Sequence, residues 1–434
     1  MRKVNEATVC RGASPIATSD AEVRGEWVTL GAERFYRIGN ADRMPPFLMS
    51  LVSDSDLWMF VSSNGGLTAG RGDSDNALFP YSTEDKIEDN ASNTGSRTII
   101  WAERNGRRYV WEPFSKAGRG LYDTTVNLYK NVAGNKLVFE EVNRDLGLEF
   151  RSRWTMSDRF GFVKQSEIAN TSASGVSLSV LDGVENLLPW GAGEEFHSRF
   201  SCLGDAYKQN ELDDETGLGI YAFTSIPGDS PEPHEALRAT VCWSTLPAAV
   251  PRLVSSAQLD VFRHGEPIRP ETRVCGRRGA YFVHTSPTLG PEERTRWQIV
   301  ADVSLGHVEI AELRRLLANT ADMARMVDAD VEEGTRTLET IVASADGLQL
   351  TGDTLGSAHH FSNVLFNVMR GGTFESSYRI PVDDLDDVVR SFNREVHERH
   401  RDFLASLGDE IDLPTLLDRV REQGDSRLLR IVHE

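Results

Sequence analysis

The hydrophobic period of the sequence changes near residue 306, and this change limits the fold more than any other feature. Before it, short runs alternate between apolar and polar residues and are separated by Gly, Asn, Asp and Pro. In "LGLEFRSRWT", Leu148 and Phe150 share one face while Glu149 and Arg151 share the other, as in a half-buried strand. Many short strands without alternating helices predict an antiparallel sandwich or barrel.

Further segments fit this pattern. The long run "FVKQSEIANTSASGVSLSVLDGVENLLPW" predicts two strands joined by a tight turn from Asn170 to Gly175. Other predicted strands are "KLVFEEV", "GIYAFTSI", "LRATVCWST", "AYFVHTS" and "RWQIVADVSL".

After residue 306 the apolar residues recur at intervals of three and four, which is the helical period. The predicted helices are "HVEIAELRRLLANTADMARMVDADVEEGTRTLETIVASA", "SAHHFSNVLFNVM", "PVDDLDDVVRSFNREVHERHRDFLASL" and "LPTLLDRVREQGDSRLLRIVHE". The sequence therefore predicts a mainly β domain over 1–306 and an α-helical segment over 307–434.

The last predicted helix carries an apolar stripe to the end of the chain. The stripe consists of Leu417, Leu428, Leu429, Ile431 and Val432. A terminal helix pair has little of its own against which to bury such a stripe. We expect either that it folds back onto the sandwich or that the natural chain continues and covers it.

Charge and cysteine content exclude several classes of function. With 47 Lys and Arg against 66 Asp and Glu, the net charge is −19, which argues against nucleic acid or an anionic membrane as partner. A neutral or small polar ligand fits better.

The four cysteines are isolated and suggest neither a disulfide framework nor a zinc site. No signal peptide or membrane span is visible, so we expect a cytoplasmic protein without metal or cofactor.

The glycine-rich stretch "SSNGGLTAGRGDSDNALFPY" matches no familiar ligand loop. In a phosphate loop, Lys and a hydroxyl residue follow the last glycine, but Arg71 and Gly72 follow Gly70 here. A calcium loop fails because Ala77 and Leu78 occupy its ligand and glycine positions. We expect a hairpin whose glycines adopt positive φ.

Two histidine pairs can be assigned by their surroundings. His359 and His360 lie in an apolar helix without nearby carboxylates at ligand spacing, so we expect core packing. His397 and His400 lie in a charged helix, so we expect a solvated face.

A mixture of aromatic, amide and carboxylate residues follows the second strand of the long run. Glu185, Asn186 and Trp190 lie close together in the sequence, and Tyr207 follows them. Aromatic faces stack on sugar rings while amides and carboxylates bind hydroxyls, so these residues, with Trp111, are candidates for carbohydrate binding. The alternative is a long loop that packs Trp190 against the sheet.

Several blocks resemble known carbohydrate-active enzymes. "SEIANTSASGVSLSVLDGVENLLPW" is similar to a strand pair of galactose-mutarotase-like supersandwich domains. "WMFVSSNGGLTAGRGDSDNALFPY" and "GSRTIIWAERNGRRYVWEPFS" resemble the N-terminal domain of the cellobiose phosphorylase group, of the glycoside hydrolase family 94 type. "DAYKQNELDDETGLGIYAF" and "FSNVLFNVMRGGTF" resemble large bacterial relatives of that group.

The resemblance implies an antiparallel β-supersandwich over 1–306 and a helical linker over 307–434 that leads into an (α/α)6 barrel absent from the chain. The general acid of that group lies in the barrel, so no catalytic residue is assigned and the chain is expected to be a fragment. Arg71 and Asp73 would be rim residues facing the barrel. Implied partners are a β-glucoside oligosaccharide, inorganic phosphate in the complete enzyme, and a second copy in a homodimer.

Three hypotheses follow. The first is a non-catalytic N-terminal part of an enzyme that acts on glycosidic bonds by phosphorolysis, hydrolysis or transglycosylation. The second is a stand-alone glycan-binding module. The third is a mutarotase-type epimerase, which would need a carboxylate base and one of His197, His234 or His284 as acid.

Overall fold

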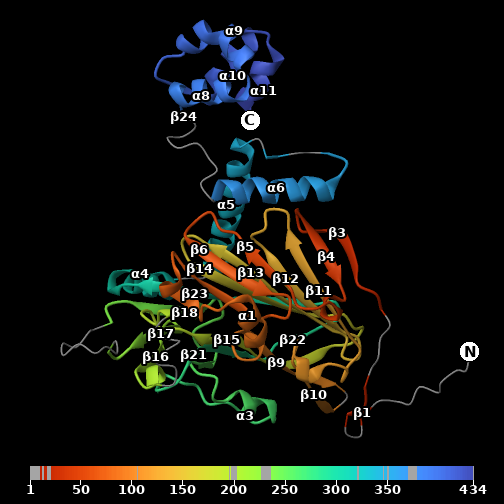
Figure 1. Ribbon diagram of the computed structural model, residues 1–434. Helices are drawn as coiled ribbons and strands as arrows, with labels where there is room; N and C mark the ends of the chain where they lie inside the picture. Colours follow the sequence, from red (N-terminus) through yellow and green to blue (C-terminus); the bar gives the residue numbers. More distant parts are fainter. Residues whose placement is uncertain are drawn as a thin grey trace, which may run out of the picture. The chain divides into compact units, whose positions relative to one another are not determined.

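The computed structural model describes residues 10–11, 14–16, 21–104, 106–194, 196, 203–225, 236–319, 322–345, 347–348, 351–369 and 379–433. The chain divides into two compact units, Met1–Glu339 and Thr340–Glu434, which we call the sheet unit and the helical unit. Figure 1 shows strands throughout the first and helices in the second. The change from strands to helices falls after Leu305, near the expected position, but the compact units divide later, at 339/340.

The large sheet of the sheet unit is antiparallel throughout. Its order is β20 (Arg273–Cys275), β16 (Lys208–Asp213), β17 (Leu218–Phe223), β18 (Ala239–Ser244), β23 (Arg294–Leu305), β14 (Gly161–Asn170), β13 (Leu148–Ser157), β12 (Leu137–Asn143), β11 (Thr124–Asn131), β4 (Glu33–Gly39) and β3 (Arg24–Leu30). Burial alternates along the first part of β13, as its sequence predicts.

Two further antiparallel sheets complete the sandwich. The second sheet has the order β10 (Arg107–Trp111), β9 (Gly95–Arg104), β15 (Val176–Leu187), β21 (Gly279–Thr285) and β19 (Arg252–Leu253), with β22 (Thr288–Leu289) beside β15. The small sheet has the order β5 (Leu48–Leu51), β6 (Leu57–Ser62), β7 (Leu67–Arg71) and β8 (Ala77–Phe79). A short pair, β1 (Cys10–Arg11) and β2 (Ser14–Pro15), precedes them.

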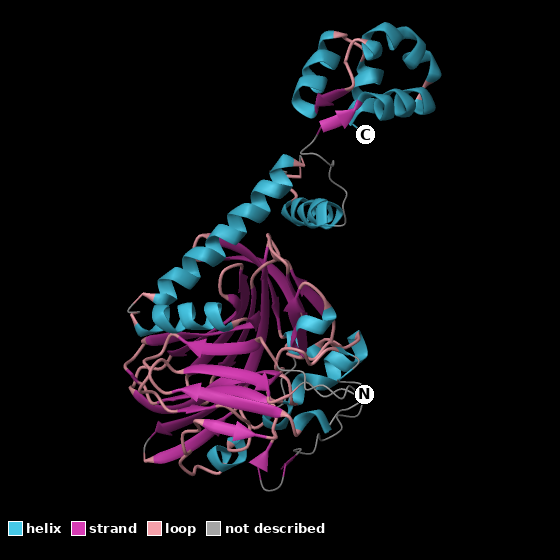
Figure 2. Cartoon of the chain, turned by 90° about the vertical axis from the view of Figure 1, so that its left-hand side faces the viewer, coloured by secondary structure: helices cyan, strands magenta, loops and turns pink. Residues whose placement is uncertain are grey.

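One apolar core joins the three sheets. It contains buried Phe150 from the large sheet, Val180 from the second sheet and Met59 from the small sheet. Burying such side chains between layers is the main driving force for this architecture. Figure 2 shows the strands stacked in layers. The prediction of a mainly β chain built on antiparallel sheets is confirmed.

The two strands of the long run are present, but they do not form a hairpin. β14 pairs with β13 and β23 in the large sheet, whereas β15 lies in the second sheet between β9 and β21. The turn between them is therefore a corner that crosses from one sheet to the other. Buried Asn170 organises this corner, since its Nδ2 donates to the carbonyls of Ser174 (2.8 Å) and Gly290 (2.9 Å).

The glycine-rich stretch forms the expected hairpin. β6 and β7 pair antiparallel, and Gly65 (φ 93°) and Gly72 (φ 69°) adopt positive φ. In the turn, Asn64 Oδ1 accepts from the Gly66 N–H at 3.1 Å, and its Nδ2 donates to the Glu88 carbonyl at 2.9 Å. The turn is thereby fixed to the end of α1 (Glu84–Asp89).

Two helices begin where the strands end, α4 (His307–Ala318) and α5 (Met323–Ser344). Val327 and Val331 of α5 pack against Trp243 of the large sheet. Carboxylates of α5 add polar contacts, such as Glu332 with the buried Lys136 Nζ at 2.5 Å. The first part of α5 thus belongs to the sheet unit. Shorter helices of this unit are η1 (Ala41–Arg43), η2 (Ser74–Asn76), η3 (Asn90–Ser92), η4 (Lys116–Gly118) and α3 (Leu259–Arg263).

The helical unit has a core of its own. Its elements are α6 (Thr354–Met369), β24 (Arg379–Pro381), α8 (Val382–Phe392), α9 (Arg394–Ala405), β25 (Glu410–Asp412), α10 (Leu413–Glu422) and α11 (Ser426–His433). Two long predicted helices are broken, at Asn393 and near Gly424. Asn393 ends α8 and caps α9, and Gly424 adopts positive φ (66°) between α10 and α11.

Part of the terminal apolar stripe is buried within the helical unit, contrary to the expectation that the terminal helices have little of their own against which to bury it. Leu428 and Ile431 are buried together with Val389 of α8 and Val396 of α9, inside the helical unit. The remaining stripe residues, Leu417, Leu429 and Val432, are half-buried. Breaking the predicted helices lets four short helices pack on one another around Leu428 and Ile431.

The predictions for the histidine pairs were also wrong in part. His359 is exposed rather than packed in a core. His397 and His400 do not lie on a solvated face: His397 Nε2 is hydrogen-bonded to Asp386 at 2.8 Å, and the buried His400 is hydrogen-bonded to Asp425 at 2.9 Å. Their carboxylate partners, far away in sequence, let polar rings be buried.

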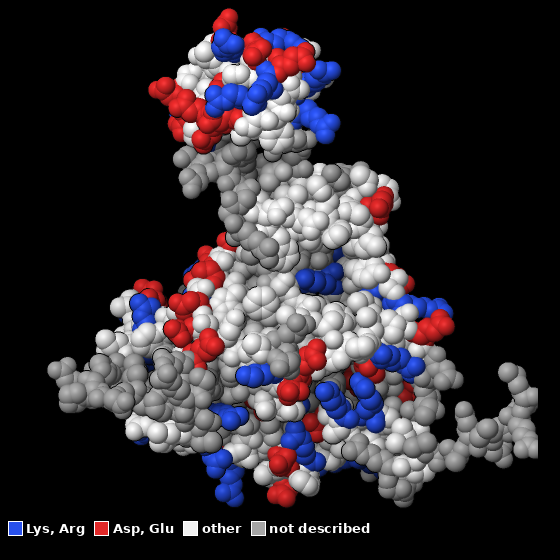
Figure 3. All heavy atoms as spheres, in the orientation of Figure 1, with Lys and Arg blue, Asp and Glu red and all other residues white. Residues whose placement is uncertain are grey.

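Surface charge is mixed on the face of the sheet unit seen in Figure 3, where acidic and basic side chains are interspersed. Within the described ranges, no helix is long and apolar enough to cross a membrane.

Candidate functional site

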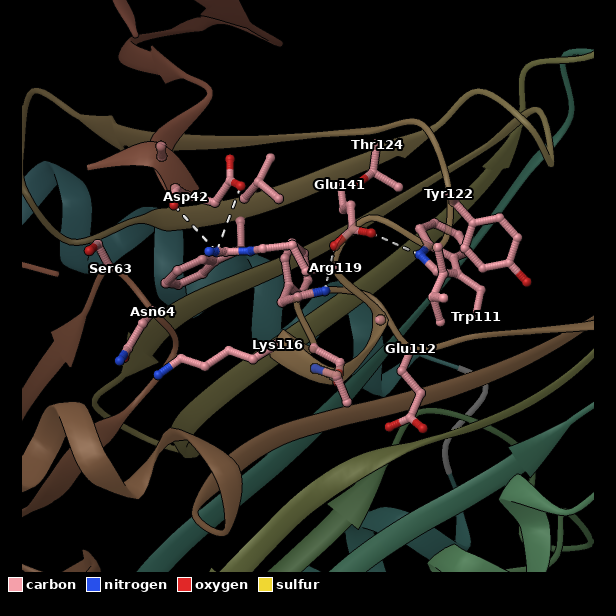
Figure 4. A pocket seen from close by; sticks show the side chains of 18 of the residues that line it. Asp42, Ser63, Asn64, Trp111, Glu112, Lys116, Arg119, Tyr122, Thr124 and Glu141 are labelled. Atoms are coloured by element: carbon pink, nitrogen blue, oxygen red, sulfur yellow. Dashed lines mark hydrogen bonds and ion pairs between the residues drawn. The ribbon is translucent and has the colours of Figure 1, made fainter. Parts of the chain in front are cut away.

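A cavity of about 280 Å³ opens in the sheet unit where β10 ends. Its wall is formed by the segment after η1, the β6–β7 turn, the loop that follows β10, and strands β11 and β12. Figure 4 shows polar side chains from these elements around the cavity. The polar lining residues are Asp42, Ser63, Asn64, Glu112, Ser115, Lys116, Arg119, Thr124 and Glu141, and the aromatic ones are Trp111, Phe114, Tyr122 and Phe139.

Glu141 of β12 positions the loop that follows β10. Its Oε1 accepts from Trp111 Nε1 at 2.9 Å, and its Oε2 accepts from the backbone N–H of Phe114 at 2.5 Å. Phe114 has φ 65°, a conformation that is costly for a residue with a side chain. The buried carboxylate therefore holds the loop in a conformation that the loop sequence alone disfavours.

Burial raises the pKa of the Glu141 carboxyl, while the two donated hydrogen bonds oppose this rise. Because both carboxylate oxygens already accept a hydrogen bond, Glu141 has a clear structural role.

Three further charged groups of the cavity, Asp42, Glu112 and Arg119, are also paired. Arg119 Nη2 donates to the Asp42 carbonyl at 3.3 Å and lies 3.7 Å from its carboxylate. Glu112 receives hydrogen bonds of 2.8 and 3.1 Å from Arg263. In the view of Figure 4, the Lys116 side chain extends towards Asn64. These groups can bind neutral hydroxyls. Their carboxylates are already paired and do not form a general acid and general base for bond cleavage.

A smaller cavity of about 40 Å³ lies beside the first. Both are lined by Asn64, Glu112, Phe114, Ser115 and Phe139. The remaining lining residues of the smaller cavity are Gly65, Ala91, Ser96, Arg97, Thr98, Pro113, Ser152 and Trp154. Because these five residues line both cavities, we treat the two as one candidate site and call them the joined cavities.

Three of the residues selected from sequence lie in or near this site. Trp111 lines the larger cavity, but it is only 2% exposed, so its ring is not an open stacking platform. Glu185 accepts hydrogen bonds from Arg97, which lines the smaller cavity, at 2.8 and 3.0 Å. Asn186 has φ 63° and donates to Thr94 Oγ1 at 2.9 Å.

The structure brings three other candidates together elsewhere, around η2. Trp190 Nε1 donates to Asn76 Oδ1 at 3.0 Å, and Asn76 Nδ2 donates to Asp73 Oδ1 at 2.9 Å. These hydrogen bonds attach the Trp190 side chain to η2. Tyr207 packs nearby against the apolar cluster that contains Ala77, the residue after η2.

Arg71 is occupied by ion pairs. Its guanidinium contacts Asp56 at 2.5 Å and Asp302 at 3.2 Å. Asp302 belongs to β23, so Arg71 joins the small sheet to the large sheet. No role at a rim is needed to explain Arg71 or Asp73.

No histidine is among the described residues that line the two cavities. Of the three histidines considered for an epimerase, His197 and His234 lie outside the described residues. His284 lines a separate hollow of about 300 Å³, with its Nε2 2.9 Å from Ser179 Oγ, and burial lowers its pKa. Among the residues that the structure describes, no group of His, Cys, Asp and Glu side chains is arranged to hold a metal ion.

Part of the helical unit matches a known family model. Residues 374–434 match the glycoside hydrolase family 149 insertion domain 1. This range contains the core of α8 to α11. No curated protein matches the sequence.

Solved structures show distant likenesses. A bacterial glucoamylase complexed with acarbose has 9% identity and a TM-score of 0.41, covering 84% of this chain and 52% of its own. A putative kojibiose phosphorylase from human microbiome has 6% identity and a TM-score of 0.28. The match covers 67% of this chain and 30% of the phosphorylase chain. A putative aldose 1-epimerase from Escherichia coli K12 has 11% identity and a TM-score of 0.32. The match covers 60% of this chain and 99% of the epimerase chain.

This chain thus spans about half of the glucoamylase and under a third of the phosphorylase. Because these TM-scores are low, we draw neither fold nor function from these structures.

Sequence reasoning missed most of the cavity lining. Asn64 was examined only as part of a turn, and Lys116, Arg119 and Glu141 were not selected. The strand pattern placed Glu141 in a predicted strand, but only the pairing of distant segments shows that it faces the loop after β10.

Proposed function

We propose that this chain is part of a carbohydrate-active enzyme that acts on glycosidic bonds, and that its sheet unit binds a saccharide in the joined cavities. The observation that carries the proposal is the match of residues 374–434 to a glycoside hydrolase insertion domain. The quoted blocks that resemble the cellobiose phosphorylase group support it independently, and with them a galactose-mutarotase-like supersandwich for the sheet unit.

The lining of the cavities suits a neutral polyol. Asn64, Ser115 and Lys116 offer hydrogen-bonding groups, and Phe114 and Tyr122 offer apolar surface. Sugar sites combine such groups, because hydroxyls need partners while the ring faces are apolar. The ligand class is a β-glucoside oligosaccharide.

We assign binding rather than bond cleavage to this site. The carboxylates of Asp42, Glu112 and Glu141 are paired with Arg119, Arg263 and backbone or indole N–H groups. Cleavage of a glycosidic bond uses two carboxyl groups on either side of the bond, one of them a proton donor. Catalysis, with phosphate or water as acceptor, would take place in another part of the complete enzyme, and that enzyme would be a cytoplasmic homodimer.

Calorimetric titration of the whole chain with cellobiose and laminaribiose tests this function. We expect saturable binding that Lys116→Ala weakens by at least threefold, about the value of one hydrogen bond. Arg325→Ala, which removes an exposed cation of α5, is the matched control and should leave binding unchanged. No heat of binding with either sugar at millimolar concentration would contradict the proposal. Phosphorolysis or hydrolysis of cellobiose by the isolated chain would contradict the assignment of binding alone.

A further inference from the structure

The smaller cavity contains a buried hydroxyl whose hydrogen bonding is incomplete. Ser152 of β13 is 2% exposed, and its Oγ has no hydrogen-bond partner among the described residues. A buried hydroxyl without a partner costs about 1–3 kcal/mol, so such groups usually have a reason to be there. Its cross-strand neighbour Ser166 is satisfied, since it donates to Asp182 at 2.8 Å.

The position of Ser152 distinguishes it from other buried hydroxyls without partners. Ser62 and Thr68 also lack partners among the described residues, but they lie in the small sheet and line neither of the joined cavities. Ser152 lies in the lining of the smaller cavity, together with Trp154 of the same strand. A ligand group that enters this cavity would lie beside the Ser152 side chain.

The size of the smaller cavity limits what can enter. Its volume of about 40 Å³ accommodates about three water-sized groups. A sugar ring does not fit, but a side arm of one carbon and one oxygen does. The residues shared with the larger cavity place the ring of the same ligand next to Phe114 and Phe139.

The charges around the smaller cavity favour a neutral group. Arg97 is neutralised by Glu185 through hydrogen bonds of 2.8 and 3.0 Å. The Thr98 hydroxyl donates to Asp182 at 2.6 Å. A carboxylate or phosphate would therefore find no unpaired cation here and would lose hydration. A hydroxyl group needs only one neutral donor or acceptor.

We propose that the smaller cavity binds the hydroxymethyl arm of a hexose whose ring occupies the larger cavity, with the Ser152 hydroxyl as its hydrogen-bond partner. This inference rests on the proposed saccharide binding and adds the selection of hexoses over pentoses. Selection arises because a pentopyranose lacks the arm and leaves Ser152 unpaired.

Titration of the whole chain with cellobiose and xylobiose tests the inference, because xylobiose has the same linkage but no hydroxymethyl groups. We expect cellobiose to bind about tenfold more tightly, the value of one or two hydrogen bonds. Ser152→Ala should reduce this ratio about threefold or more. Ser152→Leu, which fills the cavity, should weaken cellobiose binding while xylobiose binding stays the same.

Ser62→Ala is the matched control, since it removes a buried hydroxyl without a partner outside the cavities, and it should keep the wild-type ratio. Thermal melts confirm that each variant is folded. Equal binding of both sugars, or a preference that both Ser152 variants retain, would overturn the inference and leave saccharide binding intact. If neither sugar binds to the wild-type chain, the proposed function fails and the inference fails with it.

Discussion

Glu141 Oε2 accepts a 2.5 Å hydrogen bond from the backbone N–H of Phe114, whose φ is 65°. This contact joins a strand of the large sheet to the loop that forms one wall of the larger cavity. The shape of the proposed binding site thus depends on one buried carboxylate that need not touch the ligand.

Replacing Glu141 with Gln should lower the free energy of unfolding by about 1–3 kcal/mol, although the two side chains have the same shape. A carboxylate accepts from both Trp111 Nε1 and the Phe114 N–H, whereas an amide NH₂ must face one of these donors. Urea unfolding measures the change, and Glu103→Gln, at an exposed position of β9, is the control. An unchanged midpoint would show that Glu141 does not hold the loop.

Arg71→Ala should destabilise the sheet unit by about 1–3 kcal/mol, because it leaves the Asp302 carboxylate buried without its partner. Burial already raises the pKa of Asp302, and Arg71 opposes that rise. Arg24→Ala removes a cation from a pair that is about 80% exposed and should change stability little. If Arg71→Ala behaved like Arg24→Ala in thermal melts, the ion pairs of Arg71 would not stabilise the sheet unit, and a role as a rim residue would be favoured.

Lys164→Met should lower the free energy of unfolding by about 3–5 kcal/mol. The substitution leaves the charged Asp182 carboxylate in the core without a cation beside it. The two groups are 2.6 Å apart and almost fully buried, and burial lowers the pKa of Lys164. Asp182 also accepts from Trp297 Nε1 at 2.8 Å. The double variant Lys164→Met, Asp182→Asn should recover part of the loss in urea unfolding. A double variant less stable than Lys164→Met would mean that loss of the Lys164–Asp182 pair does not cause the destabilisation.

Leu428→Ala should destabilise the helical unit by about 2–5 kcal/mol, the usual cost of emptying a packed leucine site. Leu428 is fully buried among residues of α8, α9 and α10. Hydrogen exchange should show reduced protection of residues 379–433 alone. Val388→Ala, at a position 41% exposed on α8, is the control and should change protection little. An equal loss of protection in the strands of the sheet unit would contradict the division into two units.

The helical unit should also lose stability in acid. The pKa of Asp425 is held well below its usual range, first by the hydrogen bond from His400 and then by the backbone N–H of Arg427 and by Arg399. A carboxyl with a depressed folded-state pKa stabilises the fold above its unfolded pKa of about 4, and this contribution is lost as the pH falls below that value.

Exchange protection of residues 379–433, corrected for intrinsic rates, should therefore fall between pH 6 and pH 3. Asp425→Asn should lower protection at pH 6 and flatten its dependence on pH. Asp418→Asn, which removes a pair with Arg421 at an exposed position, should keep the wild-type dependence. If exchange protection in Asp425→Asn depended on pH as steeply as in the wild type, another titrating group would cause the loss of stability in acid.

Most strands and helices of this protein follow from local sequence pattern, although their ends do not. Alternation in segments such as "LGLEFRSRWT" predicted strands, and the helical period after residue 306 predicted helices, because each element buries one face and the spacing of apolar residues records that face. Asn64 and Gly65 similarly predicted a hairpin, since turn chemistry is local.

Which elements pack together depends on contacts between segments that are distant in sequence. The turn after Asn170 joins two sheets instead of two paired strands, Glu141 meets Phe114 across 27 positions of sequence, and His400 meets Asp425 across 25. Leu428 and Ile431 of the terminal stripe pack with residues of α8 and α9, which no local pattern indicated. Pairings of this kind depend on the packing of distant segments and on the burial of polar groups with their partners. The spacing of residues along the chain contains no direct record of these contacts, so the candidate site emerged only in three dimensions.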